Sequence, residues 1–82
     1  MSTVVADAVE HLVRGIVANP DDVRVEMITG RRGRTIEVHV HPEDLGKVIG
    51  RQGRTAAALR TLASTAGERE GKTVTLEIRE AR

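Results

Sequence analysis

The chain has 82 residues, of which 39% are hydrophobic and 30% charged, and its formal net charge at pH 7 is +1. These values predict one small folded domain, and the net charge alone indicates no nucleic-acid ligand. The chain has no cysteine, which excludes disulfides and thiolate metal sites, and no Phe, Tyr or Trp, which excludes RNA recognition by aromatic stacking.

The first predicted element is an amphipathic helix over residues 4–18. Its apolar residues recur at helical spacing: Val5, Val9, Leu12, Val13 and Ile16. Ser2 or Thr3 can cap its start, and Asn19-Pro20 ends it. Strict apolar–polar alternation then predicts strands over 23–29 and 35–41. The glycine-punctuated segment 29–35 between them predicts an antiparallel hairpin.

The second half begins with Pro42, Glu43 and Asp44, which suit the first turn of a helix over 42–49 that Gly50 can close. A further helix is predicted over 54–66, ending at Gly67. Alternation predicts the last strand over 73–79. The element order is therefore helix, strand, strand, helix, helix, strand, in a single domain that fills residues 1–82.

The charges are unevenly distributed along the chain. Residues 1–22 hold four acids against one Arg, whereas residues 45–67 hold four cations and no acid: Lys47, Arg51, Arg54 and Arg60. Such a basic stripe indicates a local polyanion site, although it also occurs as an ordinary solvated face. Arg31, Arg32 and Arg34 in the predicted hairpin turn either extend such a site or only solubilise the turn.

A glycine loop lies between the two central helices, with the sequence Gly50-Arg51-Gln52-Gly53. Glycine lets another backbone approach closely, and the first turn of the following helix offers unpaired N–H groups to a phosphate. The spacing fits neither the Walker A loop nor the dinucleotide fingerprint, both of which follow a strand. The loop therefore favours a phosphate backbone, while its simplest alternative role is to connect two helices.

Residues 48–54, Val-Ile-Gly-Arg-Gln-Gly-Arg, resemble the signature of the KH domain, and the element order is similar to its type II form. The length and residues 44–55 resemble the stand-alone KhpA (YlqC-like) proteins of bacteria. The resemblance covers essentially the whole chain. It implies an α+β fold in which helices pack on one face of a three-stranded mixed sheet.

The resemblance also implies a function, which is non-catalytic binding of single-stranded RNA by an RNA chaperone or post-transcriptional regulator linked to cell shape. In KH domains the loop clamps about four nucleotides. For this chain the resemblance implies that Gly50 and Gly53 permit close approach and that Arg51 and Gln52 face the phosphates. Lys47 and Arg54 flank them, and Val48 and Ile49 belong to the site. The inward residues Ile36 and Val38 line either the base groove or the core.

One residue departs from the broad KH pattern, which has a bulky aliphatic side chain where this chain has Ala56. The depth of the base groove is therefore open. His39 and His41 share a strand face with Glu37, a spacing that can hold a metal, but no further ligand is evident. We expect no metal, no cofactor, no small-molecule substrate and no catalysis, because neither Ser2 nor Ser64 lies in a nucleophile motif.

The resemblance further implies association with a second copy or with a KhpB (Jag-like) RNA-binding partner. The N-terminus lacks the pattern of a signal peptide and no apolar run is long enough to span a membrane, so we expect a cytoplasmic protein. Two alternatives remain at this stage. The domain can be a protein-interaction module, with the acidic first helix as its docking surface, or an accessory factor in ribosome maturation.

Overall fold

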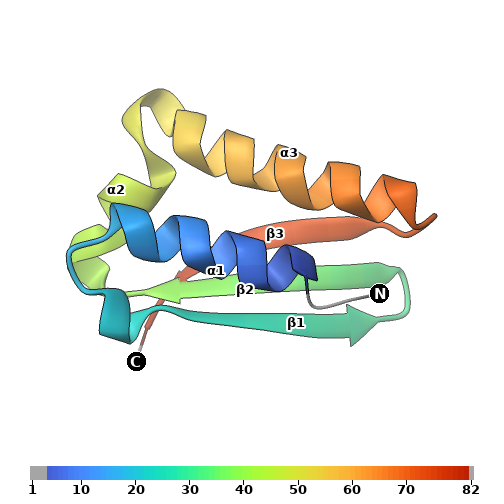
Figure 1. Ribbon diagram of the computed structural model, residues 1–82, viewed down its shortest axis with the longest axis horizontal. Coiled ribbons are helices and arrows are strands. Elements are labelled where there is room, and N and C mark those ends of the chain that lie inside the picture. The colour runs from blue at the N-terminus through green and yellow to red at the C-terminus, as the bar shows by residue number, and fades with distance from the viewer. Residues whose placement is uncertain (1–3, 82) are drawn as a thin grey trace.

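The computed structural model describes residues 4–81, which form one three-stranded sheet with all three α-helices on the same face (Figure 1). The sheet order is β1-β2-β3, with β1 antiparallel and β3 parallel to the central β2. The elements are α1 (Val4–Ile16), β1 (Arg24–Gly30), β2 (Gly33–Val40), α2 (Leu45–Ile49), α3 (Arg54–Arg69) and β3 (Val74–Glu80). This arrangement confirms the predicted α+β fold with a mixed sheet. None of the helices in residues 4–81 is long and apolar enough to cross a bilayer.

Helix α1 ends at Ile16, two residues before the predicted end at residue 18. The backbone N–H groups of Ala18 and Asn19 donate instead to the two carboxylate oxygens of Asp44, at 3.1 and 3.0 Å. A side chain far along the chain therefore takes the donors that would have continued the helix. The proposed cap at Ser2 or Thr3 lies outside the described residues.

The β1–β2 hairpin has a much shorter turn than the predicted segment 29–35, because both strands continue to the pair Gly30 and Gly33. Gly33 has φ +136°, and a Cβ there would lie 2.3 Å from the carbonyl oxygen of Thr73. The glycine thus lets β2 begin directly against the start of β3, where the Arg34 N–H donates to the Thr73 oxygen at 2.9 Å. Only Arg31 and Arg32 remain as the turn.

Helix α3 runs through Gly67 to Arg69, beyond the predicted end at residue 66. A Cβ on Gly67 would lie 2.7 Å from both the Lys72 oxygen and a methyl carbon of Val74, so this glycine permits close packing of the helix on β3. The terminating glycine is Gly71, at φ +68°. The Lys72 N–H donates to the Gly67 oxygen at 2.8 Å, which completes a Schellman motif.

The segment predicted as one helix over 42–49 consists of a 3-10 turn, Pro42–Asp44, followed by the five-residue α2. Strand β3 is shifted by one residue from the predicted 73–79. Both differences are at element ends, where local hydrogen bonding is least regular.

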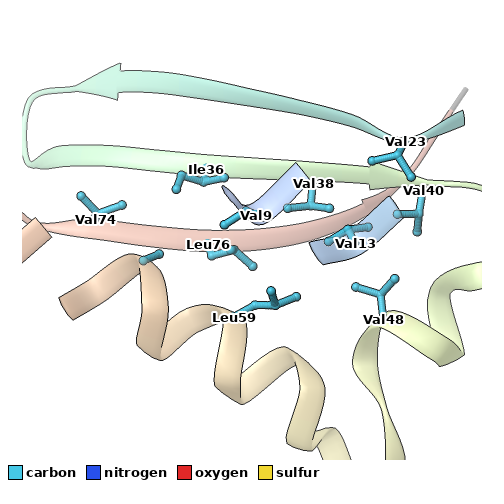
Figure 2. Packing of buried hydrophobic residues seen from close by; sticks show 11 residues of the cluster. Val9, Val13, Val23, Ile36, Val38, Val40, Val48, Leu59, Val74 and Leu76 are labelled. Atoms are coloured by element: carbon cyan, nitrogen blue, oxygen red, sulfur yellow. The ribbon is translucent and has the colours of Figure 1, made fainter. Parts of the chain in front are cut away.

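The core lies between the sheet and the helices and contains only aliphatic side chains (Figure 2). Strand β2 contributes Ile36, Val38 and Val40, each with no exposed surface. They meet Val9 and Val13 of α1 and Leu59 of α3 in one cluster. Of the two roles open for Ile36 and Val38, the structure selects the core, because neither has surface that a ligand could touch.

Candidate nucleic-acid interface

The glycine loop forms a tight connection between α2 and α3. Gly50, at φ +79°, ends α2 and donates its N–H to the Gly46 oxygen at 2.9 Å. Gly53, at φ +73°, starts α3 and donates to the Gly50 oxygen at 3.0 Å. Arg54 closes the turn with an N–H bond to the Arg51 oxygen. The N–H groups of Arg51 and Gln52 take part in none of these bonds.

The two loop glycines are needed for different reasons. A Cβ on Gly50 would collide with Thr55, whereas one on Gly53 would meet nothing within 4 Å. Gly53 is therefore favoured only by its positive φ, and Gly50 by its φ and by steric contact as well. Gln52 also has a positive φ, +57°, and is the one non-glycine residue in that region among residues 4–81. The loop is held in a specific, strained backbone conformation, as is common at ligand sites.

Cationic side chains surround the loop. Arg51, Gln52 and Arg54 are all exposed, and the Arg54 Nη2 atom donates to Gln52 Oε1 at 3.1 Å, which holds the guanidinium beside the loop. Arg51 and Arg54 form no ion pair within the described part of the chain, so their charge is available to a ligand. Lys47 is half-exposed, and its Nζ lies 3.8 Å from Asp44 Oδ1.

The two apolar residues before the loop differ in accessibility. Ile49 is 43% exposed and can contact a ligand, whereas Val48 is fully buried and belongs to the core. Ala56, the position at which the chain departs from the KH pattern, is 2% exposed. The small side chain there faces the core and not an open surface.

Asp44 fixes α2 relative to α1. It is fully buried, and besides the two backbone bonds it accepts one from the Asn19 side chain at 3.1 Å. Burial alone would raise the pKa of this carboxyl, but hydrogen bonds from Ala18 and Asn19 and the charge of Lys47 outweigh burial and hold the pKa below its ordinary value. The carboxylate is therefore an ionised structural link directly before α2.

A groove that the sequence did not reveal runs between α3 and the free edge of β3. It has a volume of about 430 Å³ and is lined by Arg60 and Ser64 of α3 and by residues 74–77 of β3. Among residues 4–81 strand β3 pairs only with β2, so its other edge, beside this groove, carries backbone N–H and C=O groups that no strand pairs. Arg60 has no ion-pair partner among residues 4–81. The exposed residues Ala57, Arg60 and Ser64 follow helical spacing. This spacing is the sequence pattern from which the α3 wall of the groove could have been predicted.

His39 and His41 have different surroundings in the fold. His39 Nε2 lies 3.3 Å from Glu37 Oε1 on the sheet face opposite the helices, whereas His41 follows β2 and its Nδ1 accepts a hydrogen bond from the Glu43 N–H at 3.0 Å. Across the residues that the structure describes, no group of three or more potential metal ligands comes together.

Comparison with known sequences places this arrangement in a family. The model of the family described as "KhpA/KhpB, KH domain" matches residues 6–78. The RNA-binding protein KhpA of Mycobacterium bovis is 78% identical over 69 residues, which cover 84% of this chain and 86% of that protein. The RNA-binding protein KhpA of Streptomyces coelicolor is 65% identical over 63 residues, covering 77% and 80%. The KhpA of Halalkalibacterium halodurans is 47% identical over 70 residues, covering 85% and 92%.

A solved structure shares the fold at much lower sequence similarity. A crystal structure of an Era variant from Aquifex aeolicus bound to GDP and AlF4⁻ matches 95% of this chain with a TM-score of 0.57 and 15% identity. This chain spans 31% of the Era chain. The match supports the fold and is independent of the close sequence relatives.

Proposed function

The chain belongs to the KhpA/KhpB family of KH domains, and we propose that it is a non-catalytic RNA-binding protein that holds single-stranded RNA at the loop Gly50-Arg51-Gln52-Gly53. The observation that carries the proposal is the loop's fixed backbone, with positive φ at Gly50, Gln52 and Gly53. Beside it lie Arg51 and Arg54, which have no acidic partner among residues 4–81. Such a loop lets a sugar-phosphate backbone approach closely while charge neutralises it.

Each residue has a distinct role in this clamp. Arg51 and Gln52 face the phosphates, and Arg54 and Lys47 flank them. Ile49 supplies apolar contact beside the loop, and Val48 supports the loop from the core. With roughly three to four phosphate contacts, log K is expected to fall with log salt at a slope of about −2 to −3.

The bases of the bound strand would lie in the groove between α3 and β3. The exposed polar groups of the β3 edge can hydrogen-bond base edges, and Arg60 and Ser64 provide side-chain donors on the opposite wall. No aromatic platform is needed for this mode of binding, which agrees with the aromatic-free composition. One module of this size contacts about four nucleotides, so we expect weak binding with little sequence preference.

The decisive experiment is fluorescence anisotropy with labelled single-stranded RNA at two salt concentrations. The double variant Arg51→Asp with Gln52→Asp should lose binding, because two negative charges replace a cation and a neutral amide where the phosphates bind. The matched control is His11→Asp with Arg14→Asp on α1, which makes the same change in charge at exposed positions away from the loop. Circular dichroism establishes that all three proteins are folded. Equal binding by the loop variant and wild type would exclude the loop as the clamp.

Association with a second copy or with a KhpB-like partner is a second part of the proposal, because a weak single module gains affinity by linkage. Helix α1 offers a surface for it, since Leu12 is 47% and Ile16 is 39% exposed on successive turns. Leu12→Glu should abolish association in analytical ultracentrifugation and leave binding of a short RNA unchanged. We place the protein in the cytoplasm, as a regulator that acts on RNA after transcription.

A further inference from the structure

Four cationic residues gather at the hairpin end of the sheet, and the clamp described above uses none of them. They are Arg31, Arg32 and Arg34 of the β1–β2 hairpin and Lys72 of the α3–β3 turn. They line two adjoining hollows of about 430 and 340 Å³, and no acidic residue lines either hollow. Glu68 and Glu70, at the end of α3, lie outside both linings. We call these four residues the hairpin patch.

The backbone beneath the hairpin patch is tightly fixed. Gly33 packs against Thr73, and the Arg34 N–H bond to the Thr73 oxygen ties the hairpin to β3. On the other side, the Schellman motif at Gly71 fixes Lys72. The backbone that carries these charges is therefore preorganised for a ligand, and the exposed side chains of Arg31 and Arg32 project beyond it.

Arg34 supplies the hairpin patch with a donor that no acceptor among residues 4–81 satisfies. Its Nη1 atom is buried and has no hydrogen-bond acceptor within the part of the chain that the structure describes. Arg34 also forms no ion pair among those residues. A buried guanidinium donor without a partner costs free energy, and an oxygen of a bound phosphate would remove that cost.

The hairpin patch is continuous with the groove along β3. Thr75 lines both the α3–β3 groove and the larger hollow of the hairpin patch. The loop and the hairpin lie at opposite ends of α3 (Figure 1). The helix has 16 residues and so extends about 24 Å. A strand that leaves the loop along the groove can therefore reach the hairpin patch. Helix α3 carries no acid before Glu68, and the acid in the groove lining, Glu77, pairs with Arg79.

From these observations we propose that the hairpin patch is a second phosphate site for the same single-stranded RNA. With this second site the protein would hold roughly twice as many nucleotides as the about four that a KH loop contacts. The proposal rests on the proposed function of the loop. The ligand at the hairpin patch is the phosphate backbone, so this site adds affinity and salt dependence without base preference.

The test compares RNA lengths. Wild type should bind an RNA of about 12 nucleotides more tightly than one of about four, the footprint of the loop. Arg31→Ser with Arg32→Ser should weaken binding of the longer RNA about tenfold and make its salt slope about 1.4 less steep, because two phosphate contacts are lost. Binding of the short RNA should not change. These side chains are exposed in a turn, so the fold should be preserved.

The matched control is Arg14→Ser with Arg24→Ser, which removes two exposed cations that form ion pairs with Glu10 and Glu26. This control should leave both RNAs bound as in wild type. If wild type binds the short RNA but gains nothing from length, or if the control weakens the longer RNA as much as the hairpin variant does, the hairpin patch is not a site. If wild type binds neither RNA, the proposed function itself fails.

Discussion

A Cβ atom on Gly50 would lie 2.3 Å from the hydroxyl oxygen of Thr55. The loop therefore folds back onto the first turn of α3, and the chain leaves no space for a side chain at this position. This contact distinguishes Gly50 from Gly53, because a Cβ on Gly53 would meet no atom within 4 Å. The signature has two glycines, but only the first is required by packing.

Alanine at the two positions should accordingly have unequal effects. Gly53→Ala faces only an unfavourable backbone angle and should lower the free energy of unfolding by about 1 kcal/mol. Gly50→Ala adds the collision with Thr55 and should lower it by about 2 to 4 kcal/mol, with loss of RNA binding. Urea unfolding measures both. Equal destabilisation would mean that Thr55 moves aside at little cost.

Gly67→Ala should destabilise the protein although alanine is the better helix former. The new Cβ would lie 2.7 Å from a carbonyl oxygen and a valine methyl, and we expect a loss of about 1 to 3 kcal/mol. Gly15→Ala on α1 is the matched control. No atom lies within 4 Å of its Cβ position, so it should stabilise the protein by up to about 1 kcal/mol. A stabilising Gly67→Ala would contradict close packing of α3 on β3.

The stability of the protein should depend on the ionisation of Asp44. Because the pKa of Asp44 in the fold is below its ordinary value of 3.8, the carboxylate stabilises the protein at pH values above 3.8. This contribution is lost as the pH falls below 3.8 through the folded-state pKa. The thermal midpoint of Asp44→Asn should be lower than that of wild type at pH 7, and the difference should shrink in acid. A difference that is the same at both pH values would rule out this role of the charge.

The substitution Ile36→Val tests whether Ile36 belongs to the core or lines the base groove. Removal of one buried methylene group should lower the free energy of unfolding by about 1 kcal/mol. RNA affinity should be unchanged, because Ile36 has no exposed surface. Anisotropy and urea unfolding on the same samples provide both values. Weaker RNA binding without a change in stability would indicate instead that Ile36 lines the groove.

The order of the elements could be predicted because each has a clear apolar period and the segments between them carry Gly or Pro. Two of the errors at element ends share one physical cause. Gly33 and Gly67 were interpreted as breaks, but both are present because a backbone from elsewhere in the chain approaches within van der Waals distance. Such an approach is a tertiary contact, and local sequence does not encode it.

The loop could be predicted because its glycines and cations are close together in the sequence, so no tertiary contact is needed to recognise it. The α3–β3 groove could not be, since Arg60 and Thr75 come together only when β3 pairs beside β2. Asp44 was interpreted as a residue favoured at the start of a helix, a local effect. Its larger role, to accept hydrogen bonds from Ala18 and Asn19, spans 26 and 25 positions of the chain.

The parallel pairing of β2 with β3 has a consequence for biosynthesis. Thr35 and Thr75 lie side by side with a hydroxyl–hydroxyl distance of 3.1 Å, although they are 40 positions apart. One wall of the groove is thus the last strand of the domain to leave the ribosome. A nascent chain can display the loop earlier, but it has no groove until β3 has also emerged.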